Sequence, residues 1–203
     1  IHLDIDPNRG KVFSEHRHCL GDREIISTRW QMTFTDTGQM RLDYEMFIAE
    51  GMPPLPRVGI LLALREDPND PLGTIHWNGY GPHENYPDRI RSAELGKWNL
   101  PIQMMHTNYI HPSDNGLRCY CRELDLGKLS VSGDFHFSVS PYGQRQLMDA
   151  RHTCDLRRND FWSVYIDGFH MGVGGDDSWT PSVKERFQLL EKYYSWSIIV
   201  SEK

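Results

Sequence analysis

The chain has 203 residues, which is long enough for one substantial hydrophobic core and does not demand a second domain. Its 22 basic and 28 acidic residues show no basic cluster, and this argues against a nucleic-acid-binding surface. No apolar run is long enough to span a bilayer, and no signal-peptide pattern opens the chain, so we expect no membrane partner.

The chain has four cysteines, Cys19, Cys119, Cys121 and Cys154, and their pairing would indicate whether the protein occupies an oxidising or a reducing compartment. Cys119 and Cys121 would share one face of a strand without being well placed to bond each other. Neither the cysteines nor the ten histidines show the spacing of a metal site. We therefore predict buried free thiols in a reducing compartment, the cytoplasm, and no metal held by this chain.

The N-terminal part of the chain is dominated by a period of two residues. Ile1, Leu3 and Ile5 already alternate, and because the chain starts within this pattern and without methionine, we expect it to be part of a longer polypeptide. Residues 26–34 and 40–48 alternate between apolar and polar side chains on either side of a short glycine turn. This pattern predicts a β-hairpin with one solvent-exposed face.

The middle of the chain alternates between short strands and turn-rich segments. The apolar run 57–64 predicts a strand covered on both faces, and 74–77 predicts a short strand. Residues 78–89 are too rich in turn formers for regular structure, 91–100 would hold one helical turn at most, and 107–110 predicts a brief strand.

The C-terminal half continues the all-β pattern. We predict strands at 117–124, 131–139, 161–166 and 193–200, with a short polar helix at 142–150. In the last strand, alternation places Tyr194, Trp196, Ile198 and Val200 on one face. Many short strands and almost no helix predict an all-β, two-sheet antiparallel β-sandwich, with residues 1–203 forming a single domain.

The segment 166–181 is the most unusual stretch, because it combines glycines, carboxylates, a histidine and a tryptophan. Gly172, Gly174 and Gly175 predict a loop forced into one particular shape. Such a loop would hold Trp179 at a functional site, where the ring would pack on a sugar or anchor a protein interface. The alternative is a tight connection whose tryptophan caps the core.

The polar residues of this segment allow several roles. Asp176 and Asp177 are adjacent, so they are expected to point apart and to bond loop amides or a cation, unlike the facing carboxyl pair of a retaining glycosidase. His170 is either a general base or a histidine tied to a backbone carbonyl. In the earlier loop, Glu84 has two possible roles. It is either functional, as an acceptor for a sugar hydroxyl or as an inter-domain contact, or it is a solvated acid that satisfies nearby amides.

Four motifs occur in a fixed order: Pro56 to Gly59, Gly79 to Arg89, Pro112 to Arg118, and Asp167 to Val183. Together they closely resemble the C-terminal domain of the large bacterial β-galactosidases, which is also found as the separate small chain of two-subunit forms. The resemblance covers nearly the whole chain and is strongest from Arg57 to Val183.

The resemblance implies a large antiparallel sandwich of the galactose-mutarotase type, a supersandwich, in a cytoplasmic enzyme. It implies that a separate barrel domain, on the same or another chain, supplies the catalytic glutamates and the magnesium and sodium sites for hydrolysis of terminal β-galactosides. It implies no catalytic residue and no metal here. Trp179 would line the sugar pocket, with His170, Asp176 and Asp177 supporting its loop, and the complete enzyme is expected to be a homo-oligomer.

The chain departs from the family pattern in two ways. Nothing in it matches the barrel, so we expect no galactosidase activity from this chain alone. A further segment that opens this domain in the family is not found before Ile1, so we expect the first part of the domain to be missing and a sheet edge or core face to be uncovered.

Two other functions stay open at this point. One is an autonomous, non-catalytic sandwich for carbohydrate binding or assembly. The other is a mutarotase-like epimerase, for which His83 with Glu84, or His170 with Asp177, are the candidate pairs.

Overall fold

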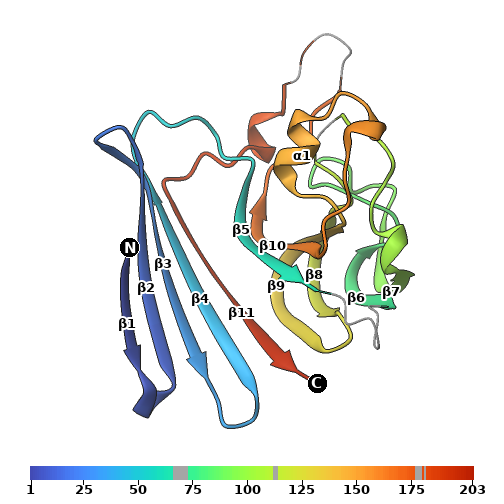
Figure 1. The fold of residues 1–203 in the computed structure, drawn as a ribbon. Helices are drawn as coiled ribbons and strands as arrows, with labels where there is room; N and C mark the ends of the chain where they lie inside the picture. The colour runs from blue at the N-terminus through green and yellow to red at the C-terminus, as the bar shows by residue number, and fades with distance from the viewer. Residues whose placement is uncertain (66–72, 112–113, 177–179, 181) are drawn as a thin grey trace.

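The computed structural model is built mainly of antiparallel strands (Figure 1). It describes residues 1–65, 73–111, 114–176, 180 and 182–203. The strands are β1 (His2–Asp6), β2 (Lys11–Leu20), β3 (Arg23–Phe34), β4 (Gln39–Ile48), β5 (Arg57–Leu64), β6 (Thr74–Gly81), β7 (Glu94–Pro101), β8 (Arg118–Asp125), β9 (Leu129–Ser140), β10 (Trp162–His170) and β11 (Tyr193–Glu202). The helix α1 spans Gln144–Asp149, and short 3-10 turns lie at Pro7–Arg9, Ile102–Met104, Thr153–Asp155 and Glu185–Phe187.

The sheet branches at β9. The first half of β9 pairs with β11, whereas the second half pairs with β10, so that β10 takes the place of β11 along the same strand. Gly133 lies at this fork with a φ of +144°, and a Cβ there would lie 3.0 Å from the Ser197 carbonyl oxygen. The fork divides the fold into a first wing, β1–β4 with β11, and a second wing, β5–β10 (Figure 1).

The main core lies between the two wings. Leu42 and Ile198 from the first wing share one buried cluster with Ile75, Phe137 and Ile166 from the second wing. Apolar faces from both wings are therefore removed from water together, which is the packing of a β-sandwich. This confirms the predicted all-β antiparallel class.

Several elements match the sequence prediction closely. The hairpin of β3 and β4 has the predicted turn, and its aromatic residues align across the sheet, since Trp30 pairs with Tyr44 and Tyr44 with Trp196. In β11, Tyr194 and Ile198 are buried on the predicted face. The strands β5, β8 and β9 and the helix α1 also lie where the patterns place them.

Other predictions are wrong for physical reasons that the structure shows. β6 continues to Gly81 because Gly79 and Gly81 permit close packing and do not form a turn: a Cβ would lie 2.4 Å from Cys121 Sγ at Gly79 and 2.7 Å from Trp98 Cδ1 at Gly81. Residues 91–100 were predicted to hold one helical turn at most, but Glu94–Pro101 form β7, and β2 was not predicted. β5 is not covered on both faces, because Leu61 is 52% exposed.

Two further corrections concern residues 107–110 and the cysteines. Thr107 bonds through both backbone groups to the Asn115 side chain, at 2.9 and 2.6 Å, so 107–110 is not a strand. All four cysteines are free, but Cys19 and Cys154 are exposed, not buried. Cys119 and Cys121 are buried in different clusters, because a register shift in β8 separates their side chains.

Within the described residues, no helix has the length and apolar character needed to cross a membrane.

Candidate functional site

The strand β10 extends four residues beyond its predicted end at Ile166, to His170, so the Gly-rich loop begins only at Met171. The strand continues past a register shift between Asp167 and Phe169. Gly168 lies at this shift, and a Cβ there would lie 2.3 Å from Trp196 Cγ. His170 is therefore the last residue of a core strand, not a residue of the loop.

A buried ion pair fixes this end of β10 to β5. The Arg57 guanidinium donates through Nη2 to Asp167 Oδ2 and through Nε to Asp167 Oδ1, the second bond at 3.2 Å. The guanidinium also stacks on the Tyr165 ring, with 4.4 Å between Cζ and the ring centroid. Burial lowers the pKa of Arg57, but Asp167 more than offsets this and raises it overall, so Arg57 stays charged.

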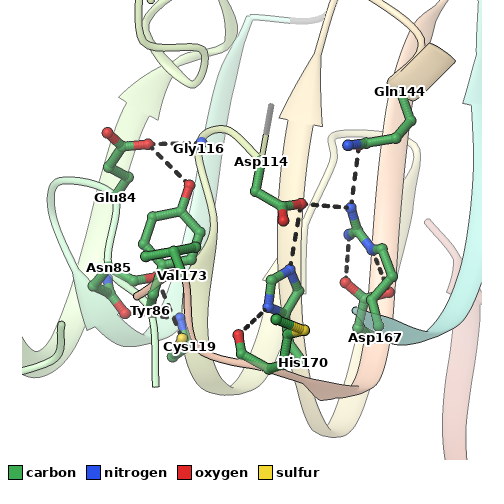
Figure 2. Close-up of polar contacts among 12 residues, drawn as sticks. Glu84, Asn85, Tyr86, Asp114, Gly116, Cys119, Gln144, Asp167, His170 and Val173 are labelled. Atoms are coloured by element: carbon green, nitrogen blue, oxygen red, sulfur yellow. Dashed lines mark hydrogen bonds and ion pairs between the residues drawn. The ribbon is translucent and has the colours of Figure 1, made fainter. Parts of the chain in front are cut away.

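Asp114 extends this network toward His170 (Figure 2). Its Oδ1 lies 3.7 Å from Arg57 Nη1 and 3.6 Å from His170 Nε2. Burial raises the pKa of Asp114, but His170 and Arg57 lower it overall. On the other side of the ring, His170 Nδ1 donates to the Met171 carbonyl oxygen at 2.7 Å. The imidazole is thus hydrogen-bonded at Nδ1, as expected for a histidine tied to a backbone carbonyl, whereas its buried Nε2 has only the longer contact with Asp114.

Glu84 is the centre of a second network (Figure 2). Its Oε2 accepts from Tyr109 Oη and Gly116 N, both at 2.8 Å, and from Tyr86 Oη at 3.3 Å. Burial, reinforced by Glu84, raises the pKa of both tyrosines, so they remain neutral donors. Glu84 therefore satisfies nearby donors, which was one of the two roles left open by the sequence.

The first turn of the loop is held by Asp88. Its carboxylate accepts the Val173 N–H at 3.0 Å and the Gly174 N–H at 2.8 Å. Gly172 lies so close that a Cβ would be 2.6 Å from Asp88 Cγ. Gly174 and Gly175 have φ values of +68° and +75°, a backbone shape that favours glycine.

Three charged side chains complete what we call the loop clamp, formed by Asp88, Arg89, Asp176 and Lys184. Arg89 Nη2 donates to the Gly174 carbonyl oxygen and lies 2.9 Å from Asp176 Oδ1. Lys184 Nζ lies 2.9 Å from Asp176 Oδ2, and Lys184 with Arg89 lowers the pKa of Asp176. Asp176 therefore joins Arg89, from the segment between β6 and β7, to Lys184, from the returning side of the loop.

The returning end of the loop, near Ser182, is held beside its outgoing end, near Gly174. A Cβ on Gly174 would lie 2.7 Å from the Ser182 carbonyl oxygen, so the two segments are in close contact. Gln188 Nε2 donates to the Val183 carbonyl oxygen at 2.6 Å, and the Gly172 N–H donates to the Phe187 carbonyl oxygen at 2.8 Å. Trp179 and Asp177, which come between these two segments in the sequence, lie outside the described residues.

The β-galactosidase small-chain family matches residues 7–200 of this sequence. The chain belongs to that family.

Its curated relatives are named β-galactosidases. The Aeromonas hydrophila relative is 44% identical over 200 residues, covering 98% of this chain and 20% of the relative. The Vibrio vulnificus relative is 46% identical over 181 residues, covering 89% and 17%. The Klebsiella pneumoniae relative is 44% identical over 191 residues, covering 94% and 18%. The small-chain sequence therefore spans about a fifth of the length of these relatives.

The structure brings only part of the predicted site together. His170 braces the loop base and Asp176 belongs to the loop clamp. The epimerase pair His83 and Glu84 is not assembled, because His83 Nε2 bonds Ser92 Oγ at 3.2 Å while Glu84 faces the two tyrosines. Among the described residues, no group of three or more His, Cys, Asp or Glu side chains is placed to hold a metal ion.

Sequence reasoning missed the roles of Asp88, Arg89, Arg57, Asp114 and Asp167. All five lie within the four motifs that carry the resemblance, but their contacts join motifs that are far apart in the sequence. An adjacent acid and base in a Gly/Pro-rich segment, as in Asp88 and Arg89, was the available sign of a loop anchor.

Proposed function

We propose that this chain is a domain of a β-galactosidase and that it lends the loop 174–183 to a sugar-binding site whose catalytic carboxylates lie in another domain. The observation that carries the proposal is the loop clamp, which holds both ends of the segment bearing Trp179. A segment fixed at both ends positions a side chain at little further entropic cost when substrate binds.

The chemistry of the described residues supports an accessory role. A retaining glycosidase uses two carboxyl groups about 5 Å apart that face one sugar. Here Glu84, Asp88 and Asp167 are each engaged by donors of the same chain, so their role is to hold backbone and side chains in place. The relatives have about four-fifths of their length outside the matched region, which is ample for a catalytic barrel.

The remaining features of the complete enzyme belong to the same proposal. In keeping with the family resemblance, the barrel, on this or another polypeptide, would bind the magnesium and sodium ions. The substrate would be a terminal β-galactoside, and the complete enzyme would be a homo-oligomer. The proposed compartment is the cytoplasm, where four free thiols, two of them exposed, are stable.

Kinetics of a Trp179→Ala variant of the full-length protein test this proposal. Loss of a ring that packs on the sugar should lower kcat/KM for β-galactosides by an amount equivalent to about 1–3 kcal/mol, mostly through a higher KM. A Phe34→Ala variant is the control, because Phe34 is an exposed aromatic residue on the first wing. Unchanged kinetics in Trp179→Ala would exclude Trp179 from the site.

A further inference from the structure

A groove with a volume of 610 Å³ opens beside β8, β9 and β10, facing the segment 186–189. This volume lies within the usual range of small-molecule sites. Aromatic rings dominate the walls, and polar atoms are interspersed among them. The residues used below are Tyr80, Tyr120, His136, Phe169 and Phe187.

Tyr120 enters the groove from a β-bulge. Arg118 pairs with Phe137 and Cys121 pairs with Phe135, so Cys119 and Tyr120 together stand against His136. Asn85 holds this bulge from the buried side, since its Oδ1 accepts the Cys119 N–H at 2.9 Å and its carbonyl oxygen accepts from Cys119 Sγ at 3.3 Å. With Cys119 drawn inward, Tyr120 is turned outward.

This arrangement places Tyr120 in a strained conformation. Its φ is +52°, a region that residues with a large side chain rarely occupy. Its side chain is 52% exposed, so the strain does not serve to bury the ring in the core. Strained residues that the surrounding structure holds in place cluster at binding sites.

The ring of Tyr120 is one part of an ordered aromatic corner. Its centroid lies 4.9 Å from the His136 ring and 6.0 Å from the Tyr80 ring, with the tyrosine rings inclined at 69°. One ring can therefore offer its face to a ligand while the other offers its edge and hydroxyl group.

His136 supplies the polar counterpart. The residue is 7% exposed, and within the described part of the chain its Nδ1, itself a buried atom, has no hydrogen-bond partner. Burial, with a smaller contribution from the neighbouring His170 and Arg57, lowers the pKa of His136 to about 3. The imidazole is therefore neutral and has one N–H and one lone pair, which suits hydroxyl groups that both donate and accept.

The apolar wall opposite Tyr120 and the paired charges at the rim indicate which class of ligand fits the groove. Phe169 and Phe187 present apolar surface, and Arg186 lies over the Phe187 ring with 4.8 Å between Cζ and the centroid. At the rim, Arg122 and Asp134 pair at 3.5 Å and offset each other's charge. A ligand with C–H faces, many hydroxyl groups and no net charge fits these walls.

We propose that this groove binds a neutral saccharide, with Tyr120 and Tyr80 as the packing surface and His136 as a hydrogen-bonding partner. The proposal does not need the galactosidase assignment, because the groove is formed by described residues of this chain alone.

The test is isothermal titration calorimetry of the full-length protein with an S-linked methyl thiolactoside, which glycosidases do not readily cleave, and with cellobiose and maltose. The variant is Tyr120→Gly, since glycine accepts a φ of +52° and the fold is preserved while the ring is lost. We expect saturable binding of at least one probe, weakened about tenfold in Tyr120→Gly. Tyr80→Leu should act in the same direction, and Phe34→Ala should bind as the wild type does.

The titrations are repeated in the Trp179→Ala background, which separates this groove from the proposed sugar contact at Trp179. Binding that persists there and falls with Tyr120→Gly supports the groove whatever the kinetics show. Binding of no probe, or equal binding by the wild type and Tyr120→Gly, would overturn the proposal. So would a lower sedimentation coefficient of Tyr120→Gly with unchanged saccharide binding, because the groove would then be a protein contact.

Discussion

The Asp88 carboxylate accepts the N–H of Gly174 at 2.8 Å, across a separation of 86 residues. It also accepts the neighbouring Val173 N–H, and because its side chain is only 5% exposed, water is poorly placed to replace either bond. This pair ties the segment between β6 and β7 to the loop that follows β10. The position of the loop is therefore set by the second wing.

Gly172→Ala should destabilise this region. The added Cβ would lie 2.6 Å from Asp88 Cγ and Oδ2, and Asp88 cannot yield without releasing two amides. We expect a loss of about 1–3 kcal/mol in the free energy of unfolding of the 203-residue chain, measured by urea titration.

The matched control for that change is Gly96→Ala on β7. A Cβ there would make an ordinary contact of 3.4 Å with the Trp98 ring, and the change should be nearly neutral. Equal losses from the two substitutions would show that the Asp88 contact does not constrain Gly172.

Arg57→Met should be strongly destabilising. It removes the partner of Asp167, whose side chain is 2% exposed, and leaves a buried carboxylate without its counter-charge. The expected loss is about 3–5 kcal/mol in the free energy of unfolding. Arg41→Met is the control, because Arg41 pairs with Asp43 while 55% exposed, and its removal should cost about 1 kcal/mol or less. A small effect at Arg57 would contradict the proposed bracing of β10 by β5.

His136 should make stability depend on pH on the acid side. Its pKa is about 3 when folded and near the ordinary 6.5 when unfolded, so the unfolded state binds more protons between these values. Stability should therefore fall as the pH drops below about 6.5, by up to about 1.4 kcal/mol per pH unit from this group. Above that pH the group contributes no dependence.

The measurement is urea unfolding of the wild type and of His136→Gln between pH 7.5 and about 5. The wild type should lose more stability than the variant across this window, because carboxylates and other histidines are common to both proteins. Parallel curves would mean that His136 titrates normally in the folded state.

The sequence was most informative for strands that have one buried and one exposed face. β3, β4 and β11 were predicted because apolar and polar residues alternate along each of them. The apolar residues, such as Trp30, Tyr44 and Trp196, then align across the neighbouring strands. β7 was missed because ELGKWNLP contains no β-branched residue and includes Gly, Asn and Pro. Its strand state comes from pairing with β6, where Trp98 stands opposite Trp77.

The candidate site shows the same limit. The glycines after His170 predicted a shaped loop, but the side chains that fix the shape come from distant segments, Asp88 and Arg89 among them. Partners separated by 85 or 86 residues share no local pattern, so the adjacent Asp88 and Arg89 could indicate an anchor but not the loop that it holds. His170 was expected in the loop because the bulge at Gly168 interrupts the alternation that would have extended β10.

The most direct test of the account is a double-mutant cycle on kcat/KM for a β-galactoside, measured in the full-length protein with Asp88→Asn and Trp179→Ala. Asp88 is a positioning residue that acts through the loop, so Asp88→Asn alone should lower kcat/KM by about tenfold, mainly through KM. In the Trp179→Ala background the same change should have little further effect, because the side chain that it positions is already absent. Fully additive losses, or wild-type kinetics in either single variant, would contradict the claim that this domain works by holding Trp179 in place.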